Sequence, residues 1–66
     1  MKFIRATRHT NRAAVFINIE AITAFEEQST ESERYTAIIL HNGREIDVSE
    51  TVEALLQPSS SHVVEL

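Results

Sequence analysis

The clearest alternation of apolar and polar positions lies in the middle of the chain, where it predicts a β-hairpin. Residues 35–41 are rich in β-branched, aromatic and other apolar types, and residues 45–48 alternate between acidic and apolar. Asn42 and Gly43 separate the two runs. This dipeptide is a strong hairpin signal, because a type I′ turn needs positive φ at both central residues. We therefore expect a two-residue turn at Asn42-Gly43.

A two-residue turn fixes how the two strands pair. It places Ile39 opposite Ile46 and Ala37 opposite Val48, so that apolar side chains share one face. Both rows of the strand over residues 35–41 are apolar, whereas the return strand turns its acidic row to solvent. A strand buried on both faces is central in its sheet or meets another chain. The protein interface predicted from this strand consists of Tyr35, Ile38, Ile39 and Leu40.

A short helix is predicted after the hairpin, because residues 52–56 carry an apolar stripe at i, i+3, i+4 spacing. Ser49 is the expected N-cap residue, and Asp47 with Glu50 forms a rival capping box. Pro58 is expected to stop the helix. So short a helix is unstable alone and must pack on the sheet. The stripe consists of Val52, Leu55 and Leu56.

Weaker patterns predict three strands before the hairpin. They span residues 2–7, 13–17 and 22–27, with polar or turn-forming segments at 9–12 and 18–21. Short connections favour antiparallel pairing between neighbouring strands. The predicted fold class is mainly β (α+β), a small curved antiparallel sheet or open barrel of about five strands with one short helix near the C-terminus.

The chain is expected to form one small domain over residues 1–57, followed by residues 58–66 as a Ser-rich linker and an edge strand or frayed tail. Below roughly 70–80 residues a single core rarely supplies more than about 3–5 kcal/mol. The 66 residues include no cysteine, so no disulfide adds stability. Self-association is the expected substitute. No apolar run approaches the ~18 residues of a membrane span. We therefore expect a cytoplasmic protein that has no membrane-spanning segment.

Positive charge gathers near the N-terminus, although the net charge is −4. No acidic residue occurs before Glu20, and four of the six cationic residues do. These charges fit an exposed edge strand protected against aggregation. The alternative is contact with nucleic acid. We expect the core to require all three phenylalanines, which leaves none of them as a stacking surface. The candidate contacts are Lys2, Arg5, Arg8, Arg12 and Arg44.

The chain lacks the residue patterns of a catalytic or metal site. His9, His41 and His62 have no close ligand spacing and are expected on the surface. The only glycine, Gly43, is used by the hairpin turn, so no Gly-rich phosphate loop is available. We therefore expect no enzyme, no cofactor and no bound metal.

Residues 16–27 contain Asn18, an acidic turn and Phe-Glu-Glu, and after a polar gap residues 35–56 contain the apolar strand, Asn-Gly and the Val-Ser-Glu-Thr-Val-Glu helix start. These two stretches resemble the short FlbD/SwrD-type flagellar-operon proteins. Those proteins also have Asn, an acidic turn, Ile and Phe-Glu-Glu, then an apolar strand, an Asn-Gly turn and a Val-x-Glu-Ser/Thr-Val-Glu helix start. The two stretches are similar, more weakly, to the core of LytTR DNA-binding domains, although residues 28–34 are net acidic where those domains present basic loops. The resemblance implies a fold rather than a function, because the shared positions are turn, cap and core residues.

The sequence as a whole favours a small interaction or adaptor module of bacterial or phage origin. We expect it to be non-enzymatic, to form a homo-oligomer and to bind a protein partner. The alternative is a regulatory module that contacts nucleic acid through its basic N-terminal strand and turn.

Overall fold

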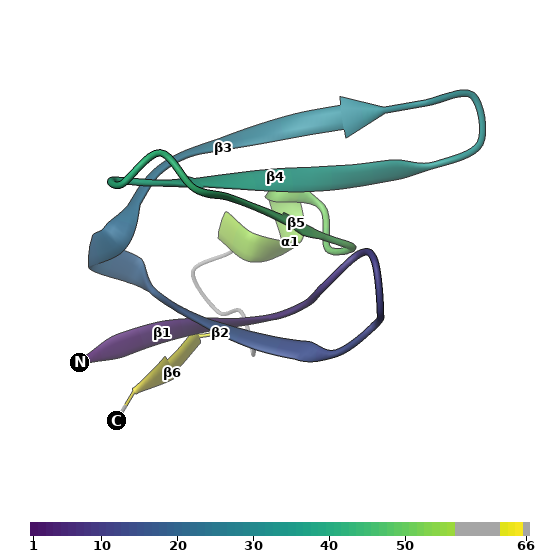
Figure 1. Cartoon of the computed structure of the whole chain (residues 1–66). Helices are drawn as coiled ribbons and strands as arrows, with labels where there is room; N and C mark the ends of the chain where they lie inside the picture. Colours follow the sequence, from purple (N-terminus) through teal and green to yellow (C-terminus); the bar gives the residue numbers. More distant parts are fainter. Residues whose placement is uncertain (57–62, 66) are drawn as a thin grey trace.

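The computed structural model describes residues 1–56 and 63–65 and contains two antiparallel sheets of three strands each (Figure 1). One sheet has the order β2-β1-β6 and the other β3-β4-β5. The predicted mainly β fold with one short helix is confirmed, and the described sheets do not close into a barrel. The elements are β1 (Lys2–Thr7), β2 (Ala14–Asn18), η1 (Ile19–Ala21), β3 (Ile22–Ser29), β4 (Arg34–Leu40), β5 (Glu45–Val48), α1 (Val52–Leu56) and β6 (Val63–Glu65).

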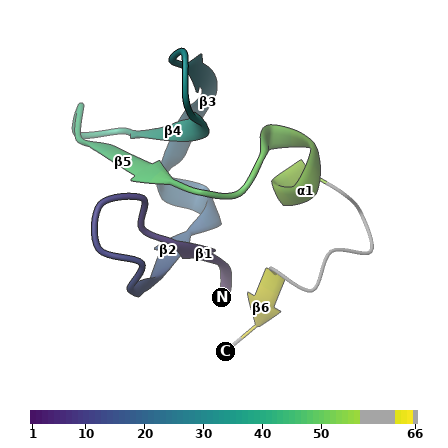
Figure 2. The same ribbon diagram turned by 90° about the vertical axis from the view of Figure 1, so that its right-hand side faces the viewer.

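The two sheets meet where the chain leaves β1. Arg8 forms an antiparallel bridge with Val48 at the end of β5. The His9 N–H donates to the Asp47 carbonyl at 2.8 Å, so the end of β1 extends the edge of the second sheet. Figure 2 shows α1 to one side of the two sheets, where the chain leaves β5. The arrangement brings the inner rows of both sheets onto one core.

The β4–β5 turn contains three residues, so the predicted two-residue turn is wrong. The Leu40 N–H donates to the Arg44 carbonyl at 2.9 Å, and the Gly43 N–H donates to the Leu40 carbonyl at 2.9 Å. Gly43 has a φ of 84°, whereas Asn42 is not among the residues with positive φ. One left-handed residue at the end of a three-residue loop defines a hairpin with a bulge, in place of a type I′ turn.

The extra loop residue moves the register of the hairpin by one. Ile38 faces Ile46 in the inner row, while Ile39 moves to the outer row. The predicted pairing of Ile39 with Ile46 is therefore wrong, as is that of Ala37 with Val48. A slip of one residue exchanges the two faces of a strand. The observed register buries Ile38 completely.

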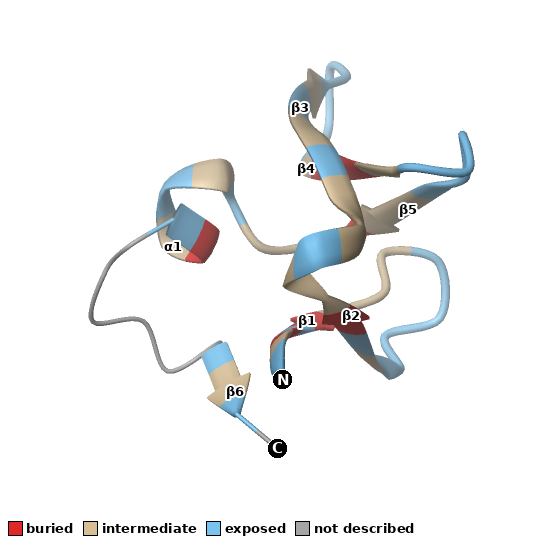
Figure 3. Cartoon of the chain, turned by 90° about the vertical axis from the view of Figure 1, so that its left-hand side faces the viewer, coloured by how far each residue is buried: buried red, intermediate tan, exposed pale blue. Residues whose placement is uncertain are grey.

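The core lies between the inner rows of the two sheets and the helix, where Figure 3 shows buried positions on β1, β2, β4 and α1. A bulge after Ile22 in β3 lets both Ile22 and Phe25 pack against this core. Its buried apolar residues are Ile4, Ala6, Ile17, Ile38, Val48 and Leu55.

The helix begins two residues after the start predicted from Ser49 and four after the start predicted from Asp47. The Ala54 N–H donates to the Thr51 hydroxyl at 3.1 Å, so Thr51 is the N-cap residue. The predicted N-cap at Ser49 and the rival capping box of Asp47 with Glu50 are wrong, because the Glu50 carboxylate accepts hydrogen bonds from Thr7 on β1 instead. Of the predicted stripe, Leu55 is buried and Leu56 is 58% exposed.

The C-terminal segment contributes a short edge strand. In β6, Val64 pairs with Phe3 of β1, as expected if the tail forms an edge strand on this chain. Of the predicted linker and tail over residues 58–66, residues 58–62 and 66 lie outside the described residues, and so does residue 57.

Candidate interaction surfaces

The four residues of the predicted interface do not share one surface. Ile38 is fully buried in the core, and Leu40 lies in the same inner row and packs against that core. Tyr35 and Ile39 lie in the outer row and are half-buried. Of the four, only these two can meet a partner without unfolding the sheet.

Tyr35 is already engaged within the chain. The His9 ring stacks on its ring, with centroids 4.6 Å apart and planes 17° apart. His9 Nε2 lies 3.1 Å from Glu33 Oε2, which ties the β1–β2 turn to the β3–β4 hairpin. Ala37, the next residue of the outer row, is fully buried. The open part of this outer face therefore surrounds Ile39.

The surroundings of Ile39 are acidic. It faces Ala24 on β3 and Glu45 on β5, and the alternation of the strands places Glu26 and Asp47 on the same side. We call Ala24, Glu26, Ile39, Glu45 and Asp47 the acidic face. None of its three carboxylates forms an ion pair with a cation among the described residues.

Crowding of these carboxylates perturbs one of them. The pKa of Glu45 is raised, first by a hydrogen bond with Asp47 and by the negative charge of Asp47, then by desolvation and by the charge of Glu26. One oxygen of Asp47, Oδ1, is buried and accepts no hydrogen bond among the described residues. The acidic face therefore carries negative charge that the described part of the chain does not compensate.

The outer face of the other sheet is aromatic and basic. Phe16 on β2 is 54% exposed and faces Arg5 on β1, while Phe3 faces Val64 on β6. Phe3 is the diagonal neighbour of Phe16 across the two strands. We call Phe3, Arg5, Phe16 and Val64 the aromatic face.

Phe3 and Phe16 contradict the expectation that all three phenylalanines serve the core, because only Phe25 packs against it. Phe16 alternates with Ile17, which is 4% exposed and belongs to the core, so Phe16 must point outward. That alternation was the available signal. Sequence reasoning missed Phe16 because a large aromatic side chain was assumed to be buried in so small a domain.

The predicted nucleic-acid contacts are distributed over both sheets. Arg5 lies in the aromatic face, and Lys2 pairs with Glu65 across β1 and β6. Arg8 lies at the bridge between the sheets, Arg12 in the β1–β2 turn and Arg44 after the β4–β5 turn. The structure therefore places only Arg5 directly opposite an exposed aromatic residue.

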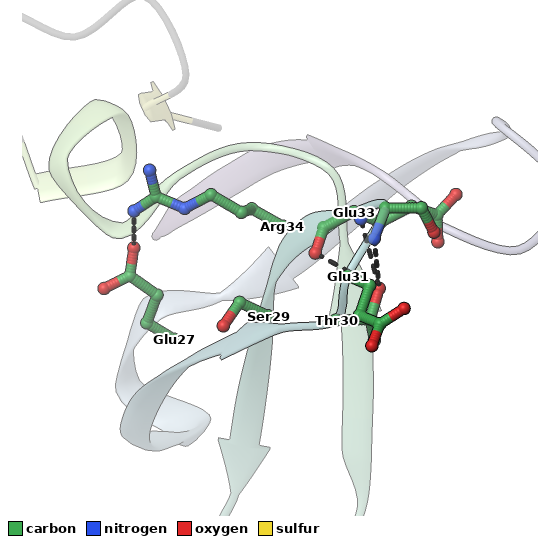
Figure 4. Close-up of a pocket in the computed structure, with 7 residues that line it drawn as sticks. Glu27, Ser29, Thr30, Glu31, Glu33 and Arg34 are labelled. Atoms are coloured by element: carbon green, nitrogen blue, oxygen red, sulfur yellow. Dashed lines mark hydrogen bonds and ion pairs between the residues drawn. The ribbon is translucent and has the colours of Figure 1, made fainter.

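A polar hollow of about 540 Å³ lies at the tip of the β3–β4 hairpin (Figure 4). Arg34 forms an ion pair with Glu27 across the two strands. The Glu33 N–H donates to the Thr30 hydroxyl at 3.1 Å, which shapes the turn. The side chains of this hollow are solvated and pair locally, and they offer no nucleophile with an orienting base.

An apolar hollow of about 490 Å³ lies where β1, η1, β3, α1 and β6 meet. Among the described residues that line it, Lys2 is the only charged one. Residues 57–62, which connect Leu56 with Val63, lie outside the described part of the chain. The lining residues are Lys2, Ile4, Ile19, Ile22, Phe25, Leu55, Leu56 and Val63.

The histidines and acidic residues do not assemble a metal centre within residues 1–56 and 63–65, where no group of three or more potential ligands is close enough. His9 and His41 each bond to other groups, and His62 lies outside the described residues. No described helix is long and apolar enough to cross a membrane.

Comparison of the chain with protein-family models, with curated proteins and with solved structures gave no match. The resemblance to FlbD/SwrD-type proteins and to LytTR domains stays a prediction.

Proposed function

We propose that the protein is a non-enzymatic interaction module that self-associates through the outer faces of its sheets. The observation that carries the proposal is the exposure of Phe16 in the middle of β2, with Phe3 and Val64 on neighbouring strands. Single exposed apolar residues are common on protein surfaces. Here the exposed Phe16 lies in one outer face with the half-buried Phe3 and Val64, so the apolar area extends over three paired strands.

The free energy available from Phe16 is large for so small a chain. Aromatic side chains bury about 150–250 Å². Covering the exposed 54% of Phe16 would contribute about 2–3 kcal/mol. This compares with the roughly 3–5 kcal/mol that one small core supplies. Self-association would thus offset the small size of the core.

Sedimentation equilibrium across a concentration series tests the proposal. We expect the wild type to form a discrete dimer or larger assembly at micromolar concentration. Phe16→Glu should be monomeric and keep the wild-type circular dichroism spectrum, because Phe16 is outside the core. Ser32→Glu, which adds the same charge at the exposed hairpin tip, is the matched control and should assemble normally. A folded wild-type monomer at high micromolar concentration would refute the proposal.

A second candidate function is contact with single-stranded nucleic acid. Arg5 lies opposite the exposed Phe16, and single-strand binders combine cations with exposed aromatic rings. Fluorescence anisotropy with a labelled oligonucleotide tests it across a salt series. Affinity should fall steeply with salt, and Phe16→Ala or reversal of Arg8 and Arg12 to Glu should abolish it. Binding that is absent at low salt would dismiss this candidate.

A further inference from the structure

The two outer faces of the molecule have complementary character. The outer rows of β1, β2 and β6 contain Arg5 and no acidic residue among those described. The outer rows of β3, β4 and β5 contain three carboxylates and no Lys or Arg among those described. Each face also offers apolar area, through Phe16 on one and Ile39 on the other.

We propose that the aromatic face of one molecule docks on the acidic face of a second copy, so that assembly is head-to-tail. This inference rests on the proposed self-association and specifies its geometry. Arg5 of one copy would lie among the carboxylates of the next, and Phe16 would cover Ile39 and Ala24.

Charge disfavours the symmetric alternative on the acidic face. Pairing of two acidic faces would bring six carboxylates together, and like charges opposed across an interface cost several kcal/mol. The pKa of Glu45 is raised, first by its hydrogen bond with Asp47 and then by the negative charges of Asp47 and Glu26, so negative charge on Glu45 is already disfavoured within one molecule. A guanidinium from a second copy would relieve that repulsion.

The positions of the two faces suit this geometry. The inner rows of both sheets converge on one core, so their outer rows point away from it in different directions. Two different surfaces that bind each other produce a ring or an open chain of copies. Two interfaces of roughly 800 Å² each would take about a third of the accessible surface of 4570 Å². A chain of this size can supply both.

Charge exchange between the faces tests the inference by sedimentation. One variant is Arg5→Glu, which makes the aromatic face acidic. The other is the double variant Glu26→Lys with Glu45→Lys, which makes the acidic face basic. All three positions are exposed, so both proteins should fold. Each alone should bind itself at least about tenfold more weakly than the wild type.

An equimolar mixture of the two variants should assemble again. The altered aromatic face of one then meets the altered acidic face of the other, and the two unaltered faces remain complementary. Thermal melts report folding of each variant. If Arg5→Glu does not fold, Phe16→Glu replaces it, because its added carboxylate also meets the introduced lysines.

The outcomes separate this inference from the proposed function. A monomeric wild type overturns both. If the wild type assembles and the double lysine variant also assembles alone, only the head-to-tail contact is overturned. A mixture that stays monomeric, when each variant is folded and monomeric, also overturns it.

Discussion

Hydrogen bonds to Glu50 connect three separate parts of the chain. Glu50 Oε1 accepts a hydrogen bond from the Thr7 N–H at 2.8 Å, and its Oε2 accepts one from the Thr7 hydroxyl at 3.0 Å. Its carbonyl accepts a third from the hydroxyl of Thr36, which is fully buried, at 2.7 Å. These bonds join the end of β1 and the middle of β4 to the segment between β5 and α1. Replacement of Glu50 should therefore weaken the contact between the two sheets.

The expected cost follows from the two carboxylate bonds. Hydrogen bonds to charged groups are each worth about 1.5–3 kcal/mol, and half-burial of Glu50 favours the lower values. Glu50→Ala should destabilise the fold by about 2–4 kcal/mol, whereas Glu50→Gln keeps an acceptor and should cost about 1 kcal/mol. A chain of 66 residues has roughly 3–10 kcal/mol of stability in total. The alanine variant would lose a large part of it.

Urea denaturation and thermal melting followed by circular dichroism measure this effect. Each kcal/mol lowers Tm by about 4–8 °C in a domain of this size. The matched control is Glu53→Ala, which removes an exposed carboxylate from the first turn of α1 and should cost less than about 1 kcal/mol. If the Tm of Glu50→Ala equals that of Glu53→Ala within error, the hydrogen bonds of the Glu50 carboxylate do not stabilise the fold.

Three further predictions concern backbone strain and charge. Gly43→Ala should lower the free energy of unfolding, measured by urea denaturation, by about 1 kcal/mol, because Gly43 has a φ of +84°. The added Cβ would meet no atom within 4 Å, so backbone strain is the only expected cost. An unchanged urea midpoint would contradict this. Arg12→Gly should raise stability by up to about 1 kcal/mol, because Arg12 has a φ of 62°, and a lower Tm would argue against strain there. Glu45 has a raised pKa in the fold, so the folded state holds its proton more tightly and stability falls as pH rises through that pKa. Glu45→Gln should therefore be more stable than the wild type at neutral pH and lose this advantage in acid. If the difference in Tm between the variant and the wild type is the same at both pH values, charge repulsion at Glu45 does not cause it.

The sequence defined the elements of this fold with good accuracy. The strand at Lys2–Thr7 ends where predicted, and the others lie within two residues of their expected ends. Local chemistry suffices for such features. Asn18, for example, accepts a hydrogen bond from the Glu20 N–H at 3.0 Å and starts the short turn of η1 without help from distant residues. Alternation of side chains also carried information that was not used, because Phe16 alternates with the buried Ile17 and therefore points outward.

Choices that depend on distant partners were decided only by the tertiary structure. Asn42-Gly43 is compatible with loops of two or three residues, and the register that buries Ile38 against the rest of the core selects the longer loop. That choice removed Ile38 from the predicted interface and left Ile39 on the acidic face. Glu50 could have capped the helix, but Thr7, 43 positions earlier, binds its carboxylate instead. Local sequence determined where strands form, because turns and alternation act over a few residues; packing determined which face each residue occupies, because burial is shared by the whole chain.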